Sequence, residues 1–133
     1  MSVRYPRNGL LALVVEDDFM VAKMLETALH VRGFSIMGPV ATAKEALNLM
    51  AALTPDVALL DYRLKIGTTE ELLPTLERLG ARVCFLSGFA YPGMSPLFDK
   101  YPLLMKPFRQ SDLFEFLDQS FGDVSSWRRR PTS

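Results

Sequence analysis

Short apolar runs that alternate with segments of helical periodicity constrain the fold of this chain most. The runs occupy residues 10–15, 34–37, 57–60, 83–86 and 103–105. The first and third runs are continuously apolar, which is typical of strands buried on both faces. Strands that alternate with helices form parallel sheets covered by helices on both faces. The sequence therefore predicts an α/β fold with a five-stranded parallel sheet.

The segments between the runs carry signals of helix starts and helix faces. Residues 19–32 follow an expected N-cap at Asp18 and repeat apolar side chains at helical spacing. In a capping box, a threonine and a glutamate three residues later bind the first free N–H groups of a helix. Two such boxes predict helices that begin at Thr42 and Thr68. An apolar stripe over residues 113–121 predicts the last helix.

Length and composition limit the class of protein. A chain of 133 residues suits one domain with one core. Fifteen basic and fifteen acidic residues cancel, so the net charge indicates neither nucleic acid nor an anionic membrane as a partner. The single cysteine, Cys84, excludes an internal disulfide framework and a cysteine-based zinc site. We expect a cytoplasmic protein with an N-terminal extension over 1–9, a folded domain over 10–121 and a flexible tail over 122–133.

Polar residues directly follow four of the five predicted strands. Glu16 and Asp17 follow the first strand, Asp61 follows the third, Ser87 the fourth and Lys106 the fifth. Ligands of open α/β sheets bind beyond the carboxyl ends of the strands, where these ends meet at one edge. The sequence therefore predicts that the five side chains converge on one site.

The chemistry of this predicted site follows from its charges. Carboxylates from two strands at ~4 Å repel each other by about 4 kcal/mol at an effective dielectric constant of 20. A divalent cation is their natural partner, and oxygen ligands select Mg²⁺, or else Mn²⁺, over zinc. A lysine and a serine beside the ion supply a positive charge and a hydroxyl donor for phosphoryl oxygens. This set of groups suits phosphoryl transfer to a carboxylate.

Four motifs together resemble those of the receiver domains of two-component response regulators. They are Val-Val-Glu-Asp-Asp at 14–18, Leu-Leu-Asp at 59–61, Ser-Gly at 87–88 and Lys-Pro-Phe at 106–108. The resemblance extends over residues 10–121. It implies a flavodoxin-like, doubly wound sheet with strand order 2-1-3-4-5. It also implies a phosphorelay regulator, rather than an enzyme, that accepts a phosphoryl group from a histidine kinase or a histidine phosphotransfer protein.

The same resemblance implies a role for each residue of the predicted site. Asp61 matches the phosphoacceptor, and Ser87 and Lys106 match the residues that bind the phosphoryl group. Three positions match the Mg²⁺ ligands beside Asp61: Asp17 directly, Glu16 through water, and Arg63 through its backbone carbonyl. The resemblance therefore implies a phosphoprotein whose phosphorylation requires Mg²⁺.

The sequence departs from the family pattern where activation is usually transmitted. Leu103 stands where many receivers have a tyrosine or phenylalanine, and Gly88 stands where alanine is commoner. The expected switch region therefore comprises Ser87, Gly88, Phe89 and Leu103. Proline and glycine weaken any helix in residues 88–101, so we expect this segment to become ordered on phosphorylation.

Two other functions stay open at this stage. Leu103 leaves room for a receiver-like binding module that does not need phosphorylation. An aspartyl-nucleophile phosphohydrolase of the haloacid-dehalogenase type would need an aspartate where Arg63 stands. For the leading function we expect a monomer or weak dimer that signals through an unidentified downstream protein. We expect no direct contact with nucleic acid or membrane, and residues 122–133 are too few for an output domain.

Overall fold

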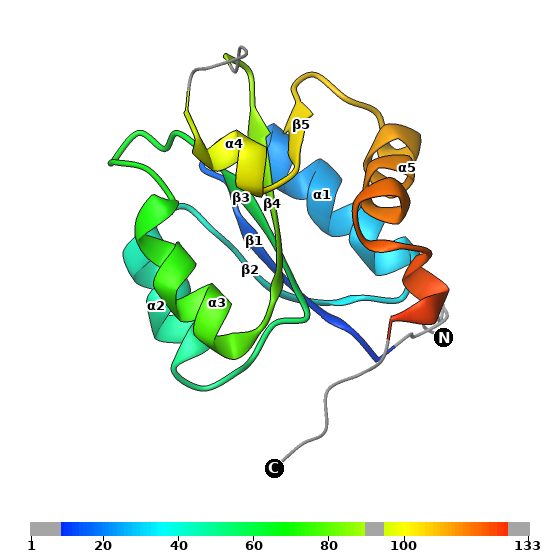
Figure 1. Cartoon of the computed structure of the whole chain (residues 1–133), viewed down its shortest axis with the longest axis horizontal. Helices are drawn as coiled ribbons and strands as arrows, with labels where there is room; N and C mark the ends of the chain where they lie inside the picture. The colour runs from blue at the N-terminus through cyan, green and yellow to red at the C-terminus, as the bar shows by residue number, and fades with distance from the viewer. Residues whose placement is uncertain (1–8, 90–94, 128–133) are drawn as a thin grey trace.

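The computed structural model describes residues 9–89 and 95–127 (Figure 1). In chain order the elements are β1 (Leu11–Val15), α1 (Phe19–Val31), β2 (Ser35–Val40), α2 (Ala43–Met50), β3 (Val57–Asp61), a 3₁₀ turn (Glu70–Leu72), α3 (Leu73–Leu79), β4 (Arg82–Ser87), α4 (Leu97–Lys100), β5 (Leu103–Met105), α5 (Gln110–Phe121) and a second 3₁₀ turn (Val124–Ser126). The strands pair in parallel in the order β2-β1-β3-β4-β5. The predicted fold class and strand order are therefore confirmed.

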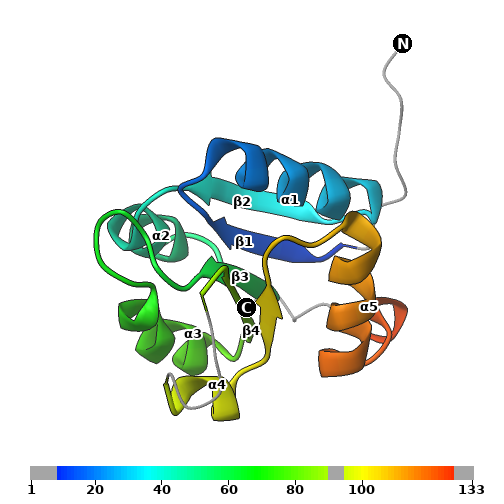
Figure 2. The same cartoon turned by 90° about the horizontal axis from the view of Figure 1, so that it is seen from above.

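Helices cover both faces of the sheet and create a core on each side. Helices α1 and α5 lie on one face, and α2 and α3 lie on the other (Figures 1 and 2). Alternate residues of β1 serve the two cores: Ala12 and Val14 face α1 and α5, while Leu13 and Val15 face the other side. Among the described residues no helix is long and apolar enough to cross a bilayer. The two cores hold the carboxyl ends of the strands in fixed register.

The helix starts follow the predicted signals only in part. Asp18 caps α1, because its Oδ1 accepts hydrogen bonds from the N–H groups of Met20 and Val21 at 2.9 and 3.2 Å. Thr42 caps α2 by accepting from the N–H of Glu45 at 3.1 Å.

The capping box predicted at Thr68 is wrong. A 3₁₀ turn over Glu70–Leu72 comes first, and α3 begins only at Leu73. Pro74 stands in the first turn of α3 and has no N–H, so it cannot form the helical bond back to residue 70. The α-helical hydrogen-bond pattern is therefore interrupted at that point.

Residues 122–127 also differ from the expected flexible tail. Trp127 is buried, with edge contacts to the rings of Phe34 and Phe121 at centroid distances of 6.0 and 5.9 Å. The guanidinium of Arg82 lies 4.3 Å from the centre of the Trp127 ring. The large apolar area of the indole favours packing over exposure, so the folded domain continues to Trp127. Residues 128–133 of the expected tail and 1–8 of the expected extension lie outside the described residues.

Replacing Trp127 by alanine should destabilise the domain strongly. Loss of a buried tryptophan costs about 3–5 kcal/mol, which lowers the melting temperature of a domain of this size by roughly 10–20 °C. Thermal unfolding followed by circular dichroism measures the change. Phe89→Ala is the matched control, because the Phe89 side chain is 82% exposed and should contribute little to stability. Equal melting temperatures for Trp127→Ala and the wild type would contradict the packing described above.

Candidate functional site

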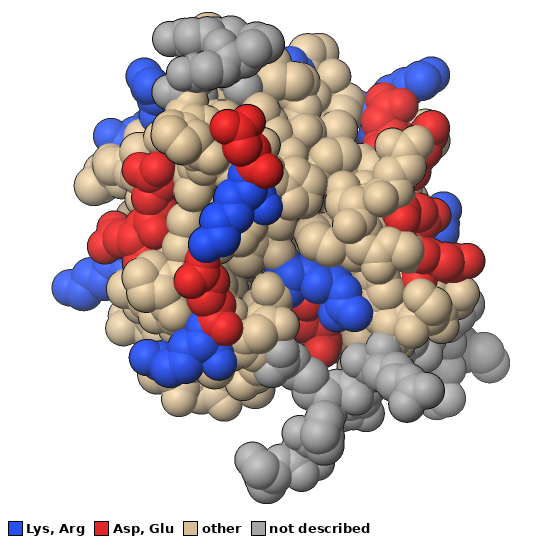
Figure 3. Space-filling model, viewed as in Figure 1, with Lys and Arg blue, Asp and Glu red and all other residues tan. Residues whose placement is uncertain are grey.

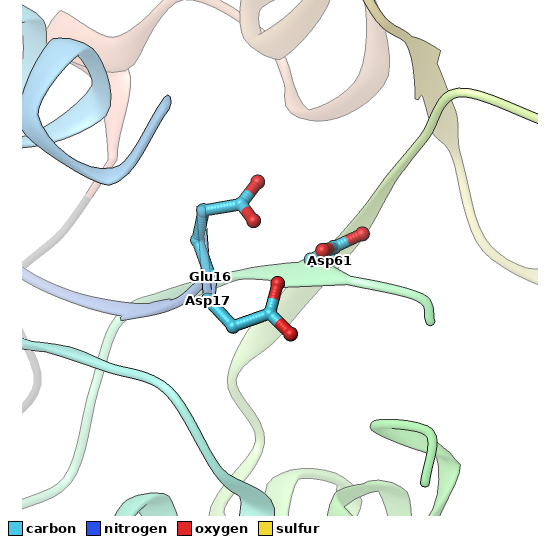
Figure 4. A group of neighbouring side chains, drawn as sticks. All are labelled: Glu16, Asp17 and Asp61. Carbon is cyan, nitrogen blue, oxygen red and sulfur yellow. The ribbon is translucent and has the colours of Figure 1, made fainter. Parts of the chain in front are cut away.

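Three carboxylates meet at the carboxyl edge of the sheet, as the sequence predicts (Figure 4). Glu16 and Asp17 follow β1, and Asp61 ends β3; the two strands are paired through Val15 and Leu60. One carboxylate oxygen of each acidic residue lies within 4.8 Å of the corresponding oxygens of the other two. Glu16 and Asp61 are buried, and Asp17 is half-buried. The site thus concentrates three acidic groups that water screens only weakly.

Lys106 is the cation that contacts two of these carboxylates. Its Nζ lies 2.5 Å from Oε1 of Glu16 and 3.5 Å from Oδ2 of Asp61. The other oxygen of Glu16 accepts a hydrogen bond from the N–H of Asp18 at 3.0 Å. The Lys106 N–H donates to the Ser87 carbonyl at 2.9 Å, which fixes the lysine to the end of β4. One ammonium group therefore contacts two of the three carboxylates.

The pKa values of the site reflect burial together with the neighbouring charges. The pKa of Asp61 is raised to about 7, first by burial and then by the hydrogen bond and the charge of Glu16; Lys106 opposes the rise. Burial lowers the pKa of Lys106, but Glu16 and Asp61 outweigh it and the net shift is upward. A second cation would relieve the crowding, and a set of carboxylate oxygens fits Mg²⁺ or Mn²⁺.

The loop after β3 lies over the acidic cluster. The Lys65 N–H donates to Oδ2 of Asp17 at 2.5 Å. The Leu64 N–H donates to the Gly67 carbonyl at 3.0 Å and closes a turn, beside a bridge between Arg63 and Thr68. The two hydrogen bonds that flank this bridge are formed by the residues before and after Arg63. The Arg63 carbonyl accepts neither of them. The sequence could not reveal the Lys65 contact, because a backbone donor depends on the path of the loop.

Ser87 lies on the same edge, at the end of β4. It pairs with Met105 in β5, directly before Lys106, and it is buried. Its hydroxyl oxygen accepts a hydrogen bond from the Phe89 N–H at 3.1 Å. The hydroxyl hydrogen can still be donated to a ligand.

An aromatic cluster that the sequence analysis missed lies beside Leu103 of the predicted switch region. Leu103 is half-buried in the core on the α2 and α3 side. Tyr62, next to the phosphoacceptor candidate, contacts Phe98 of α4 at a centroid distance of 5.1 Å. Both rings contact Phe85 of β4, at 5.9 and 5.8 Å. Helix α4 therefore packs, through Phe98, against the ring that directly follows β3. Residues 90–94 are part of the segment that is expected to become ordered, and they lie outside the described residues.

Comparisons with known proteins show which solved structures share this fold. A scan against models of protein families found no match. A search of curated proteins also found no match. Solved structures do resemble the chain. A CheY-like response regulator receiver domain protein from Methanospirillum hungatei JF-1 has a TM-score of 0.72 and 25% identity, over 83% of this chain and 91% of that one.

Two further solved structures are similar over most of the chain. SdrG from Sphingomonas melonis Fr1 has a TM-score of 0.71 and 28% identity, over 83% of this chain and 94% of that one. The receiver domain of the sensor histidine kinase PA1611 from Pseudomonas aeruginosa PAO1, described with a magnesium ion coordinated in its active site cleft, has a TM-score of 0.71 and 23% identity, over 86% and 99%. The chain has the fold of the CheY-like receiver domains of response regulators.

Replacing Asp61 by asparagine should stabilise the metal-free protein in a pH-dependent way. The pKa of Asp61 is about 7 in the folded state, against an ordinary value of 3.8. The contribution of Asp61 to stability is therefore fully present below pH 3.8 and is lost as the pH rises through 7. Asp61→Asn removes this loss, so its melting temperature should exceed that of the wild type by several degrees at about pH 8, and by less at about pH 5.

Saturating Mg²⁺ at the higher pH should reduce the difference, because the wild type gains more from binding the ion. Asp99→Asn, at an exposed position of α4, is the matched control and should shift the melting temperature little. A fall in the melting temperature of Asp61→Asn at about pH 8 without metal would contradict the repulsion between the clustered carboxylates.

Proposed function

We propose that the chain is a phosphorelay response regulator that accepts a phosphoryl group on Asp61 and signals by contact with other proteins. The observation that carries the proposal is the cluster of Glu16, Asp17 and Asp61 beside Lys106, at the edge of a receiver fold where ligands of such sheets bind. The phosphoryl donor would be a histidine kinase or a histidine phosphotransfer protein.

The residues of the site supply what the transfer needs. An Asp61 carboxylate oxygen attacks the phosphorus atom, a new O–P bond forms, and the N–P bond of the donor phosphohistidine breaks and leaves its electron pair on the imidazole. Lys106 neutralises charge on the phosphoryl oxygens, and the Ser87 hydroxyl donates to one of them.

A divalent cation would be held by residues of the same cluster. Asp17 and Asp61 would hold Mg²⁺ directly, together with the Arg63 carbonyl, and Glu16 would reach it through water. The ion supplies positive charge that offsets the carboxylates and the phosphoryl oxygens. The residues themselves position the acceptor oxygen, because the paired strands fix β1 against β3.

The surface around the site suits a protein as the phosphoryl donor. Large apolar side chains within three residues of the site residues in sequence are exposed: Phe19, Met20, Ile66, Phe89 and Met105. Exposed apolar groups that gather around a polar centre are typical of protein–protein interfaces. The described residues on the face seen in Figure 3 form no continuous basic patch that would attract nucleic acid, because acidic and basic side chains are interspersed over α3 and α4. There Lys100 pairs with Glu77 at 3.1 Å.

Incubation with acetyl phosphate and Mg²⁺ should add one phosphoryl group, about 80 Da by intact mass spectrometry. Asp61→Asn should gain nothing, since it lacks the acceptor. Asp17→Asn should lose most of the phosphorylation, because it removes a direct carboxylate ligand, and Glu16→Gln should lose less. No mass gain in the wild type would favour a binding module that works without phosphorylation. Full phosphorylation of both ligand variants would contradict the proposed place of the ion.

Phosphorylation, or beryllofluoride with Mg²⁺, should protect backbone amides of residues 88–101 from hydrogen exchange. We expect this because the Ser87 hydroxyl, which accepts from the Phe89 N–H, is drawn toward the phosphoryl group, and because α4 is four residues long with no buried side chain. Hydrogen exchange followed by mass spectrometry measures the change. Ser87→Ala should be phosphorylated nearly normally and lose the protection. Protection confined to the loops at Asp17 and Asp61 would exclude this switch.

A further inference from the structure

One buried polar side chain at the carboxyl edge has no part in the proposed phosphoryl transfer. The buried polar or charged residues among those described are Glu16, Asp56, Asp61, Thr69 and Ser87. Three of them belong to the site. Asp56 precedes β3 at the opposite edge, where its carboxylate accepts from the Leu11 N–H at 2.8 Å. Thr69 remains, and it is fully buried although it stands in the loop after β3.

Thr69 binds two consecutive backbone carbonyls at the end of β3. Its hydroxyl donates to the Asp61 carbonyl at 3.0 Å. Its N–H donates to the Tyr62 carbonyl at 3.1 Å. The two bonds fix the peptide units on either side of Tyr62. One of these units begins at Asp61, and the other ends at Arg63.

The same bonds close the base of the loop that covers the acidic cluster. Within the loop, the Leu64 N–H donates to the Gly67 carbonyl, and the Lys65 N–H donates to Asp17. The loop therefore carries the Arg63 carbonyl and also contacts a carboxylate of β1. A shift of residues 61–63 would move the phosphoacceptor, the proposed backbone ligand and the contact with Asp17 together.

We propose that Thr69 is a positioning residue for the divalent cation. Its hydroxyl holds the peptide after Asp61 and so fixes the phosphoacceptor relative to the proposed backbone ligand at Arg63. The proposal rests on the proposed metal site and goes beyond it, because Thr69 touches neither the ion nor the phosphoryl group. Groups that orient metal ligands in this way typically affect affinity by about 10-fold or more when they are removed.

The test is the affinity of the full chain for Mn²⁺, measured by electron paramagnetic resonance of the free ion well below the melting temperature. Thr69→Val keeps the shape of the side chain and removes the hydroxyl, and it should weaken Mn²⁺ binding about 10-fold. Thr69→Ser keeps the hydroxyl and should bind like the wild type, although it loses a packed methyl group. Thr68→Val is the matched control, because the Thr68 hydroxyl contacts Glu70 rather than Asp61.

If the valine variant does not fold, the Mn²⁺ affinities of Thr69→Ala and Thr69→Ser are compared instead. Normal Mn²⁺ affinity in a folded variant without the hydroxyl, or equal weakening in the serine variant, would overturn the role of Thr69. Asp17→Asn in the same assay separates the two proposals. If Asp17→Asn binds Mn²⁺ like the wild type, the metal site itself is wrong. If only Asp17→Asn is weakened, the metal site stands and the role of Thr69 is refuted.

Discussion

Repulsion among carboxylates that the sheet forces together is the interaction on which the rest of the site depends. Pairing of β1 with β3 brings Glu16, Asp17 and Asp61 to one edge, with carboxylate oxygens within 4.8 Å of one another. At such distances each pair of ionised groups repels by roughly 3–4 kcal/mol at an effective dielectric constant of 20. The strands cannot separate to relieve this repulsion, because both faces of the sheet are packed. The fold therefore holds the carboxylates in an arrangement that favours the binding of a cation.

The surrounding groups respond to this excess of acidic groups. Lys106 offsets part of it by direct contact with Glu16 and Asp61. The pKa of Asp61 is still raised, first by burial and then by Glu16. The loop after β3 brings the Lys65 N–H to Asp17. The loop therefore lies against the acidic cluster, and the ring of Tyr62, which follows Asp61, packs against α4.

The sheet and the acidic cluster were predictable because both depend on residues adjacent in sequence. Apolar runs set the strands, and parallel strands carry their following residues, such as Asp61 and Lys106, to one edge. Contacts between distant segments were not predictable. The bond from the Lys65 N–H to Asp17 is formed by a backbone group, so no residue type in the sequence indicates it. Trp127 stands in a polar segment, and the sequence does not show that it packs against Phe34. Thr69 looked like part of a helix start, whereas its hydroxyl bonds to the end of β3.

Chemical trapping of the modified residue tests the central claim most directly. Borohydride reduces an aspartyl phosphate to homoserine and leaves an unmodified carboxylate intact. After treatment with acetyl phosphate and Mg²⁺, followed by borohydride, peptide sequencing by mass spectrometry should find homoserine at position 61 and aspartate at position 17. Omission of Mg²⁺ should abolish the conversion. Homoserine at another acidic position, or an unchanged Asp61 in a protein that has gained a phosphoryl group, would contradict the account.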